Sequence, residues 1–161
     1  MAVRDLVRYP DPILRQQAKS IPKVDKALKT LIDDMASAMR EEHGAGLAAN
    51  QVGVLQKILV YDDGNGLGIL INPKIVSSEG EQVGIEGCLS VPGLQGEVRR
   101  AEKIVVKGVD ATGKNVRIKA EGFLARILQH EIDHLAGKLF LDRVEPNTLE
   151  YINVTSEEPE E

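Results

Sequence analysis

Apolar residues recur at helical spacing in two separate segments of the chain. In residues 26–41 they lie three and four positions apart, on one face of a helix: Leu28, Leu31, Ile32, Met35 and Met39. Residues 122–135 show a similar apolar stripe, and Gly137 follows as a stop signal. The pattern predicts one amphipathic helix near the N-terminus and a second near the C-terminus.

Short runs of β-branched and aliphatic residues occupy the chain between these helices. They begin at Lys57 (KILVYD), Gly68 (GILIN) and Lys74 (KIVSS), and two later runs, KIVVKGVD and NVRIKAEG, flank ATGK as in a hairpin. The glycine-rich segment GAGLAANQVG, residues 44–53, is expected to be a turn that ends the first helix. A helix, a block of strands and a second helix predict an α+β fold.

The chain shows no internal repeat and no linker that would divide it. Its 161 residues fit the size of one domain, and we assign residues 1–145 to it. Residues 146–161 form a short, acidic C-terminal extension. Its last part, TSEEPEE, lacks apolar residues and is expected to be partly disordered.

Composition and charge exclude several classes of protein. A hydrophobic share of 42% with 28% charged residues is typical of a soluble globular protein. The net charge of -5 argues against a general nucleic-acid binder, which needs an excess of cations. No apolar run approaches a membrane span, and Asp5 and Pro10 interrupt the segment where a signal peptide would need one. The expected location is the cytoplasm.

The second predicted helix contains the H-E-x-x-H pattern typical of zinc hydrolases, in QHEIDHLAG (residues 129–137). His130 and His134 lie one turn apart on one side, and they are two of the three histidines of the chain. Glu131 lies close enough to reach a water on a metal held there. An ordinary amphipathic helix could also contain this pattern by chance. However, burying the carboxylate of Glu131 without a partner would destabilise the fold.

A metal site needs a third protein ligand, which this helix does not supply. The extended G-x-x-H motif fails because Phe140 stands in its last position, and neither Glu145 nor Glu150 lies on a recognisable helix. Cys88, in EGCLSVPG, is the remaining soft ligand, where a strand could end before a turn formed by residues 91–93. One cysteine with two histidines leaves a position open for water, which is the catalytic pattern. The alternative for Cys88 is a small buried apolar residue.

Three segments in this order resemble the peptide deformylase family: GAGLAANQ (residues 44–51), EGCLS (residues 86–90) and QHEIDHL (residues 129–135). DPILR near the start is similar to a fourth family feature, and the resemblance extends over about residues 5–143. It implies mixed or antiparallel β-sheets around a central metal-binding H-E-x-x-H helix, all within a catalytic domain. It also implies removal of the N-formyl group from the starting methionine of new proteins, with release of formate.

The resemblance also implies roles for individual residues. Cys88, His130 and His134 would bind the metal, and Glu131 would accept the proton of the attacking water. The side-chain amide of Gln51 and the backbone N–H of Leu89 would stabilise the oxyanion. The peptide and its methionine would contact six residues near this site: Gly44, Ala45, Gly46, Phe123, Arg126 and Ile127.

Arg126 has two open interpretations. Its methylenes could line the methionine pocket while the charged head stays in water, or it could lie on a plain solvated helix face. Glu86 is expected to support the site, paired with Arg100, and Asp133 either orients a group near the histidines or lies on the surface. The segments 44–51 and 86–90, taken one at a time, could instead be a helix cap and a packed turn.

The expected cofactor is one divalent metal ion, Fe2+ in the cell, with Zn2+, Ni2+ or Co2+ possible in purified protein. The expected partners are N-formylmethionyl nascent peptides and the ribosome. The chain departs from the family at Asn50, at Leu94 and Gln95, and at its C-terminus, which shows no basic helix for ribosome docking. The alternatives are another metal amidase or small peptidase with the same site, or a non-catalytic module that binds N-termini.

Overall fold

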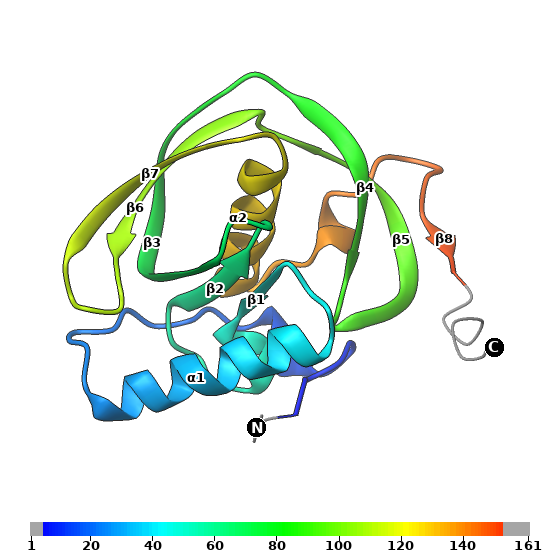
Figure 1. Ribbon diagram of the computed structural model, residues 1–161. Helices are drawn as coiled ribbons and strands as arrows, with labels where there is room; N and C mark the ends of the chain where they lie inside the picture. The colour runs from blue at the N-terminus through cyan, green and yellow to red at the C-terminus, as the bar shows by residue number, and fades with distance from the viewer. Residues whose placement is uncertain (1–4, 153–161) are drawn as a thin grey trace.

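The computed structural model describes residues 5–152, and Figure 1 shows their arrangement. The elements in chain order are η1 (Pro12–Arg15), α1 (Lys26–Glu41), β1 (Gly46–Ala48), η2 (Ala49–Val52), β2 (Ile58–Asp62), β3 (Leu67–Glu79), β4 (Gln82–Cys88), β5 (Val91–Arg100), β6 (Lys103–Val109), β7 (Asn115–Glu121), α2 (Gly122–Leu135), η3 (Phe140–Asp142) and β8 (Glu150–Tyr151). Within the described range, no helix combines the length and apolarity needed to cross a membrane.

Helix α1 begins and ends where the apolar spacing predicts. The Asp25 side chain caps it by accepting a hydrogen bond from the backbone N–H of Leu28 at 2.9 Å. Its apolar face packs on β1 and β2 and forms an aliphatic cluster with Leu47, Ile58 and Val60. In Figure 1, α1 lies below β1 and β2.

Helix α2 also has the predicted bounds, and it lies at the centre of the molecule between the strands (Figure 1). Gly137, with φ of 80°, follows its end as predicted. A Cβ atom at this position would lie 2.5 Å from the carbonyl oxygen of Arg15, so the close approach of η1 also requires glycine. The end of α2 is therefore packed directly against the N-terminal part of the chain.

The strands form two antiparallel sheets, in the orders β1-β2-β3-β6-β7 and β4-β5-β8. The β6–β7 pair is the predicted hairpin. The runs that begin at Gly68 and Lys74 belong to one strand, β3, rather than two. Pro73 has no N–H to donate, and the register shifts between Ile71 and Lys74 let the strand continue past it. The α+β class and the central helix are confirmed.

Two local predictions were wrong, one for residues 44–53 and one for residues 91–93. The glycine-rich segment 44–53 is more than a turn, since it contains β1 and η2. Residues 91–93 begin β5, and the turn is formed by the two residues before them, Leu89 and Ser90. The extension after residue 145 contains β8, which pairs with Leu94 and Gln95 of β5. The acidic TSEEPEE segment lies outside the described residues.

Candidate active site

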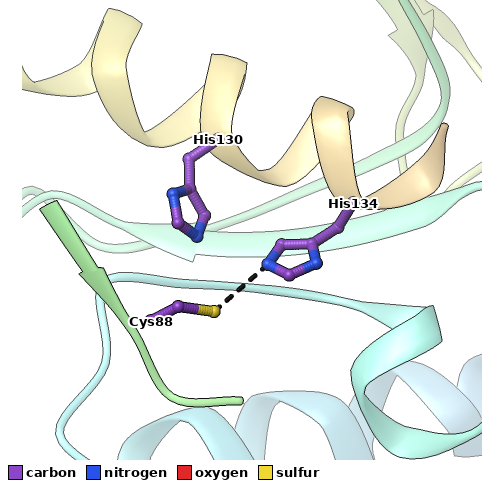
Figure 2. A group of neighbouring side chains, drawn as sticks. All are labelled: Cys88, His130 and His134. Carbon is purple, nitrogen blue, oxygen red and sulfur yellow. Dashed lines mark hydrogen bonds between the residues drawn. The ribbon is translucent and has the colours of Figure 1, made fainter. Parts of the chain in front are cut away.

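Cys88 and the two histidines of α2 form one compact group. Cys88 is the last residue of β4, so the predicted strand end is correct, and its Sγ lies 3.2 Å from Nε2 of His134. One ligand atom from each of Cys88, His130 and His134 lies within 4.8 Å of the others. Figure 2 shows the two rings extending from the helix toward the sulfur. These three donors therefore fit a single metal ion.

Glu86 holds His130 in the orientation that such an ion requires. Nδ1 of His130 lies 3.0 Å from the Glu86 carboxylate and donates to it, which leaves Nε2 as the nitrogen available to a metal. Burial alone would lower the pKa of His130, but the negative charges of Glu131, Cys88 and Glu86 raise it well above the usual value. The surroundings of this ring therefore favour a positive charge.

His134 is completely buried, and burial lowers its pKa well below the usual value. The imidazole is therefore neutral, which is the form that binds a metal. A thiolate and two imidazoles suit Fe2+, Zn2+, Ni2+ or Co2+, whereas Mg2+ and Ca2+ prefer oxygen donors. The chemistry of the donors and the anionic surroundings both fit a divalent transition-metal ion.

Glu131 lies beside this group with no partner for one of its oxygens. Glu131 is only 4% exposed, and its Oε1 has no hydrogen-bond partner among the described residues. Burial raises the pKa of this carboxyl to about 7. A Cβ atom at Gly46 would lie 2.8 Å from Oε2 of Glu131, so glycine in β1 makes room for the carboxylate. A buried oxygen without a partner indicates a place for a ligand.

Gln51 presents its amide N–H groups toward the same place. Its Oε1 accepts a hydrogen bond from the backbone N–H of Ala48 at 2.9 Å, which fixes the orientation of the amide. Nε2 then donates to Oγ of Ser90 at 3.2 Å and lies 3.6 Å from Sγ of Cys88. Leu89 follows Cys88 in the turn between β4 and β5. The Gln51 amide of η2 therefore lies near the sulfur, close to the start of this turn.

Both oxygens of the Glu86 carboxylate accept hydrogen bonds from neighbouring side chains. It accepts two hydrogen bonds from Arg100, one from Arg126 and one from His130. Burial raises its pKa, but these donors outweigh burial and bring the pKa to about 2. The predicted Glu86–Arg100 pair is confirmed. Asp133 orients Arg100 from the other side, at 2.7 Å, so its connection to the histidines is indirect.

Both interpretations of the Arg126 head were wrong. The residue is only 8% exposed, and its guanidinium lies between α2 and the sheet rather than in water. Its Nη1 donates to Glu86 and to the carbonyl of Val98, and a Cβ atom at Gly84 would lie 3.1 Å from its Nη2. Glycine at position 84 therefore lets the guanidinium lie flat against β4. The sequence pattern gave no sign of this contact.

A cleft of about 510 Å³ opens beside the metal-binding group. All six residues expected to contact the peptide line it, together with Gln51, Cys88, Leu89, His130 and Glu131. One wall is the segment that leads into β1, and the other is the end of β4. The cleft is also lined by residues that the sequence did not assign to it, among them Arg8, Glu42, Ile85 and Ile152. They lie far apart in the sequence, and only the fold brings them to the cleft.

Comparison with known proteins gives a consistent result. The model of the polypeptide deformylase family matches residues 3–150. A peptide deformylase of Halothermothrix orenii is 52% identical over 146 residues, which cover 89% of this chain and 95% of the relative. The crystal structure of the Thermotoga maritima peptide deformylase is similar, with a TM-score of 0.88 and 41% identity over 91% of this chain and all of that one (100%). A Synechococcus elongatus peptide deformylase, solved in complex with actinonin, gives the same TM-score of 0.88 and 41% identity over 91% of this chain and 81% of that one.

Proposed function

Since this chain belongs to the polypeptide deformylase family, we propose a mechanism by which its residues remove the N-formyl group from the methionine of new peptides. The reaction is hydrolysis of the formyl amide: a C–O bond to water forms, the C–N bond breaks, and formate and a free amine leave. The observation that carries the mechanism is the buried, unpartnered oxygen of Glu131 beside the Cys88–His130–His134 group.

We propose that Cys88, His130 and His134 bind one Fe2+ ion in the cell, and that Zn2+, Ni2+ or Co2+ can replace it in purified protein. When bound, such an ion supplies Lewis acidity to water and to the formyl oxygen. The protein contributes the orientation: Glu86 holds the ring of His130, and burial keeps His134 neutral. Metal analysis of anaerobically purified protein would identify the native ion.

Glu131 is the proposed general base and acid. Its Oε1 has no other hydrogen-bond partner among residues 5–152, so it is available to take a proton from the attacking water. The same carboxyl then returns the proton to the leaving amine nitrogen. Gly46 leaves room for the carboxylate against β1, at the edge where the formyl group would lie.

Gln51 and Leu89 are the proposed donors to the developing oxyanion. The Gln51 amide is already oriented by Ala48, so it needs no rearrangement during the reaction. The N–H of Leu89 comes from the turn that follows Cys88. These two donors approach the reacting carbon from different elements, η2 and the β4–β5 turn.

The peptide is proposed to bind as an extended strand between two sheet edges. β1 is the end strand of the five-stranded sheet, and β4 is the end strand of the three-stranded sheet. Gly44, Ala45 and Gly46 carry small side chains that let a peptide backbone approach closely. The methionine side chain would enter beside Phe123, Ile127 and the methylenes of Arg126.

This activity belongs with protein synthesis, and we propose that the protein meets nascent chains in the cytoplasm. Contact with the ribosome is part of this proposal, although the described residues contain no basic C-terminal helix. After η3, the described chain continues instead into β8, which pairs with β5.

Formate release from a short formyl-methionyl peptide tests the mechanism most directly. Protein purified without oxygen and loaded with iron or nickel is expected to release formate from the formyl peptide and to leave the acetyl peptide intact. Failure to turn over the formyl peptide, with one metal ion bound per chain, would contradict the proposal. Such a result would point to another amide substrate or to a binding role.

A further inference from the structure

The N-terminal segment that precedes η1 is hydrogen-bonded to both oxyanion-donor segments. The backbone N–H of Val7 donates to the carbonyl of Gln51 at 2.7 Å, and the N–H of Tyr9 donates to the carbonyl of Ser90 at 2.7 Å. Between them, Nη1 of Arg8 donates to the carbonyl of Leu89 at 2.9 Å. Three consecutive residues therefore fix the backbone of both segments from the side of the N-terminus.

The Leu89 carbonyl is the acceptor that matters most for the proposed chemistry. Leu89 and Ser90 form the turn of the β4–β5 hairpin, because Cys88 pairs with Val91. Peptide units at such a turn can rotate, and rotation at Leu89 would move its N–H away from the cleft. The carbonyl belongs to the next peptide unit, Leu89–Ser90, which meets the unit that carries the N–H at the Cα of Leu89. A donor that holds this carbonyl therefore leaves the neighbouring unit and its N–H fewer orientations.

Two contacts restrict Leu89 from different directions. A Cβ atom at Gly44 would lie 2.7 Å from Cδ1 of Leu89, so the leucine side chain packs closely over this glycine. Arg8 holds the backbone of the same residue, and a charged donor makes a stronger hydrogen bond than a neutral one. Arg8 is otherwise exposed and lines the cleft, so packing alone does not require an arginine there.

We propose that Arg8 is a positioning residue that sets the direction of the Leu89 N–H for catalysis. This inference rests on the proposed function, in which Leu89 donates to the oxyanion. Removing an oxyanion donor costs roughly a hundredfold to a thousandfold in kcat. Loosening the donor without removing it costs less, and about a tenfold loss of kcat is expected.

The test compares Arg8→Met and Arg8→Lys with the wild-type protein, using a formyl-methionyl peptide and metal-loaded enzyme. Arg8→Met keeps the length of the side chain but loses its donors, and kcat is expected to fall about tenfold with KM nearly unchanged. Arg8→Lys keeps a charged donor and is expected to recover part of kcat. Arg117→Met, which changes an exposed arginine of β7, is the matched control and is expected to behave like wild type.

The readouts separate positioning from other roles. Unchanged metal content and melting temperature in Arg8→Met, with lower kcat, support positioning of Leu89. A rise in KM with kcat intact would overturn the inference, because Arg8 would then act on the peptide itself. An equal loss in Arg8→Lys and Arg8→Met, or wild-type kcat in Arg8→Met, would also overturn it. The wild-type protein is assayed in parallel. Its turnover tests the proposed function, whereas the difference between the variants and wild type tests the role of Arg8.

Discussion

The two helices bury their inner faces by different means. In α1 the buried residues are mostly aliphatic or methionine, and they pack into a cluster with β1 and β2. In α2 the buried set also includes ionisable side chains: Arg126, His130, Glu131 and His134. Apart from Asp34, packing explains the face of α1. On the face of α2, β4 and β5 supply partners for Arg126 and His130, whereas Oε1 of Glu131 and Nδ1 of His134 have none among the described residues.

This difference shows where stability and chemistry lie in the molecule. Burial of apolar area stabilises α1 without any specific orientation. Around α2, burial would destabilise each charge unless another charge or a hydrogen bond compensates. Glu86 provides that compensation for Arg100 and Arg126, whereas Oε1 of Glu131 has no partner among the described residues. Changes on the two helices should therefore affect different observables.

The largest effect is expected for Glu131→Gln, which removes the proposed proton acceptor and keeps the shape of the side chain. Formate release should fall by about a thousandfold or more, within the range for loss of a general base. Bound metal should remain, and stability should be unchanged or higher, because a poorly solvated carboxylate is replaced by an amide. Steady-state kinetics, metal analysis and a thermal melt would test this. Activity close to that of wild type would assign the proton transfer to another group.

Glu86→Gln should weaken both the fold and the metal site. Two buried arginines lose their carboxylate, and breaking such a pair costs about 3–5 kcal/mol of unfolding free energy. The metal should bind roughly 10–100-fold more weakly, because His130 loses its charged carboxylate acceptor. Urea unfolding and metal competition would measure the two effects. The control Glu81→Gln removes an exposed partner of Arg99 and should cost less than about 1 kcal/mol.

Met35→Ala tests the other helix. Met35 is 0% exposed in the aliphatic cluster, so truncation should cost about 2–5 kcal/mol of unfolding free energy. At temperatures where the variant is folded, kcat and metal affinity should match wild type, because no residue of the site changes. Met35→Leu nearly conserves volume and should cost less than about 1.5 kcal/mol. A large loss of kcat in folded Met35→Ala would mean that the two helices are coupled.

The smallest effect concerns the ion pair between Arg15 of η1 and Asp142 of η3. Burial raises the pKa of Asp142, but the hydrogen bonds from Arg15 and from the Leu139 N–H outweigh it and lower the pKa below the usual value. The pair therefore stabilises the fold above the unfolded pKa near 4, and this contribution disappears as pH falls through the folded pKa. Since both side chains are partly exposed, we expect about 0.5 kcal/mol.

Comparing wild type with Asp142→Asn in urea at several pH values isolates this contribution. The difference in unfolding free energy should be present at pH 6 and should shrink as the pH falls below 4 toward the lowered pKa of Asp142 in the folded protein. A difference that stays constant over this range would show that the carboxylate charge contributes nothing.

The helices could be predicted from the sequence because their signals are local. Apolar spacing, the capping Asp25 and Gly137 lie within or next to the segments that they define. The hairpin around ATGK is local as well. The metal ligands could be proposed because H-E-x-x-H places two of them on one helix face, and the strand end at Cys88 was the remaining choice.

The rest depends on contacts between distant residues. β5 begins with Val-Pro-Gly, which has the composition of a turn, and it becomes a strand only through pairing with β4 and β8. Beyond its predicted pairing with Arg100, Glu86 also contacts Arg126 and His130, which lie 40 and 44 residues along the chain. No periodicity shows such a cluster. For the same reason, the hydrogen bond from Arg8 to Leu89, at a separation of 81 residues, could not be predicted.

The placement of the metal ligands has a consequence for how the chain unfolds. Cys88 ends β4, whereas both histidines lie on α2, and β5, β6 and β7 lie between them in sequence. An ion bound to all three would act as a removable cross-link that closes a long loop, as a disulfide does. Closing a loop of this length in an unfolded chain costs roughly 3–5 kcal/mol of entropy. Metal-free protein should therefore open first where α2 meets the β4–β5 hairpin, and hydrogen exchange would locate that opening.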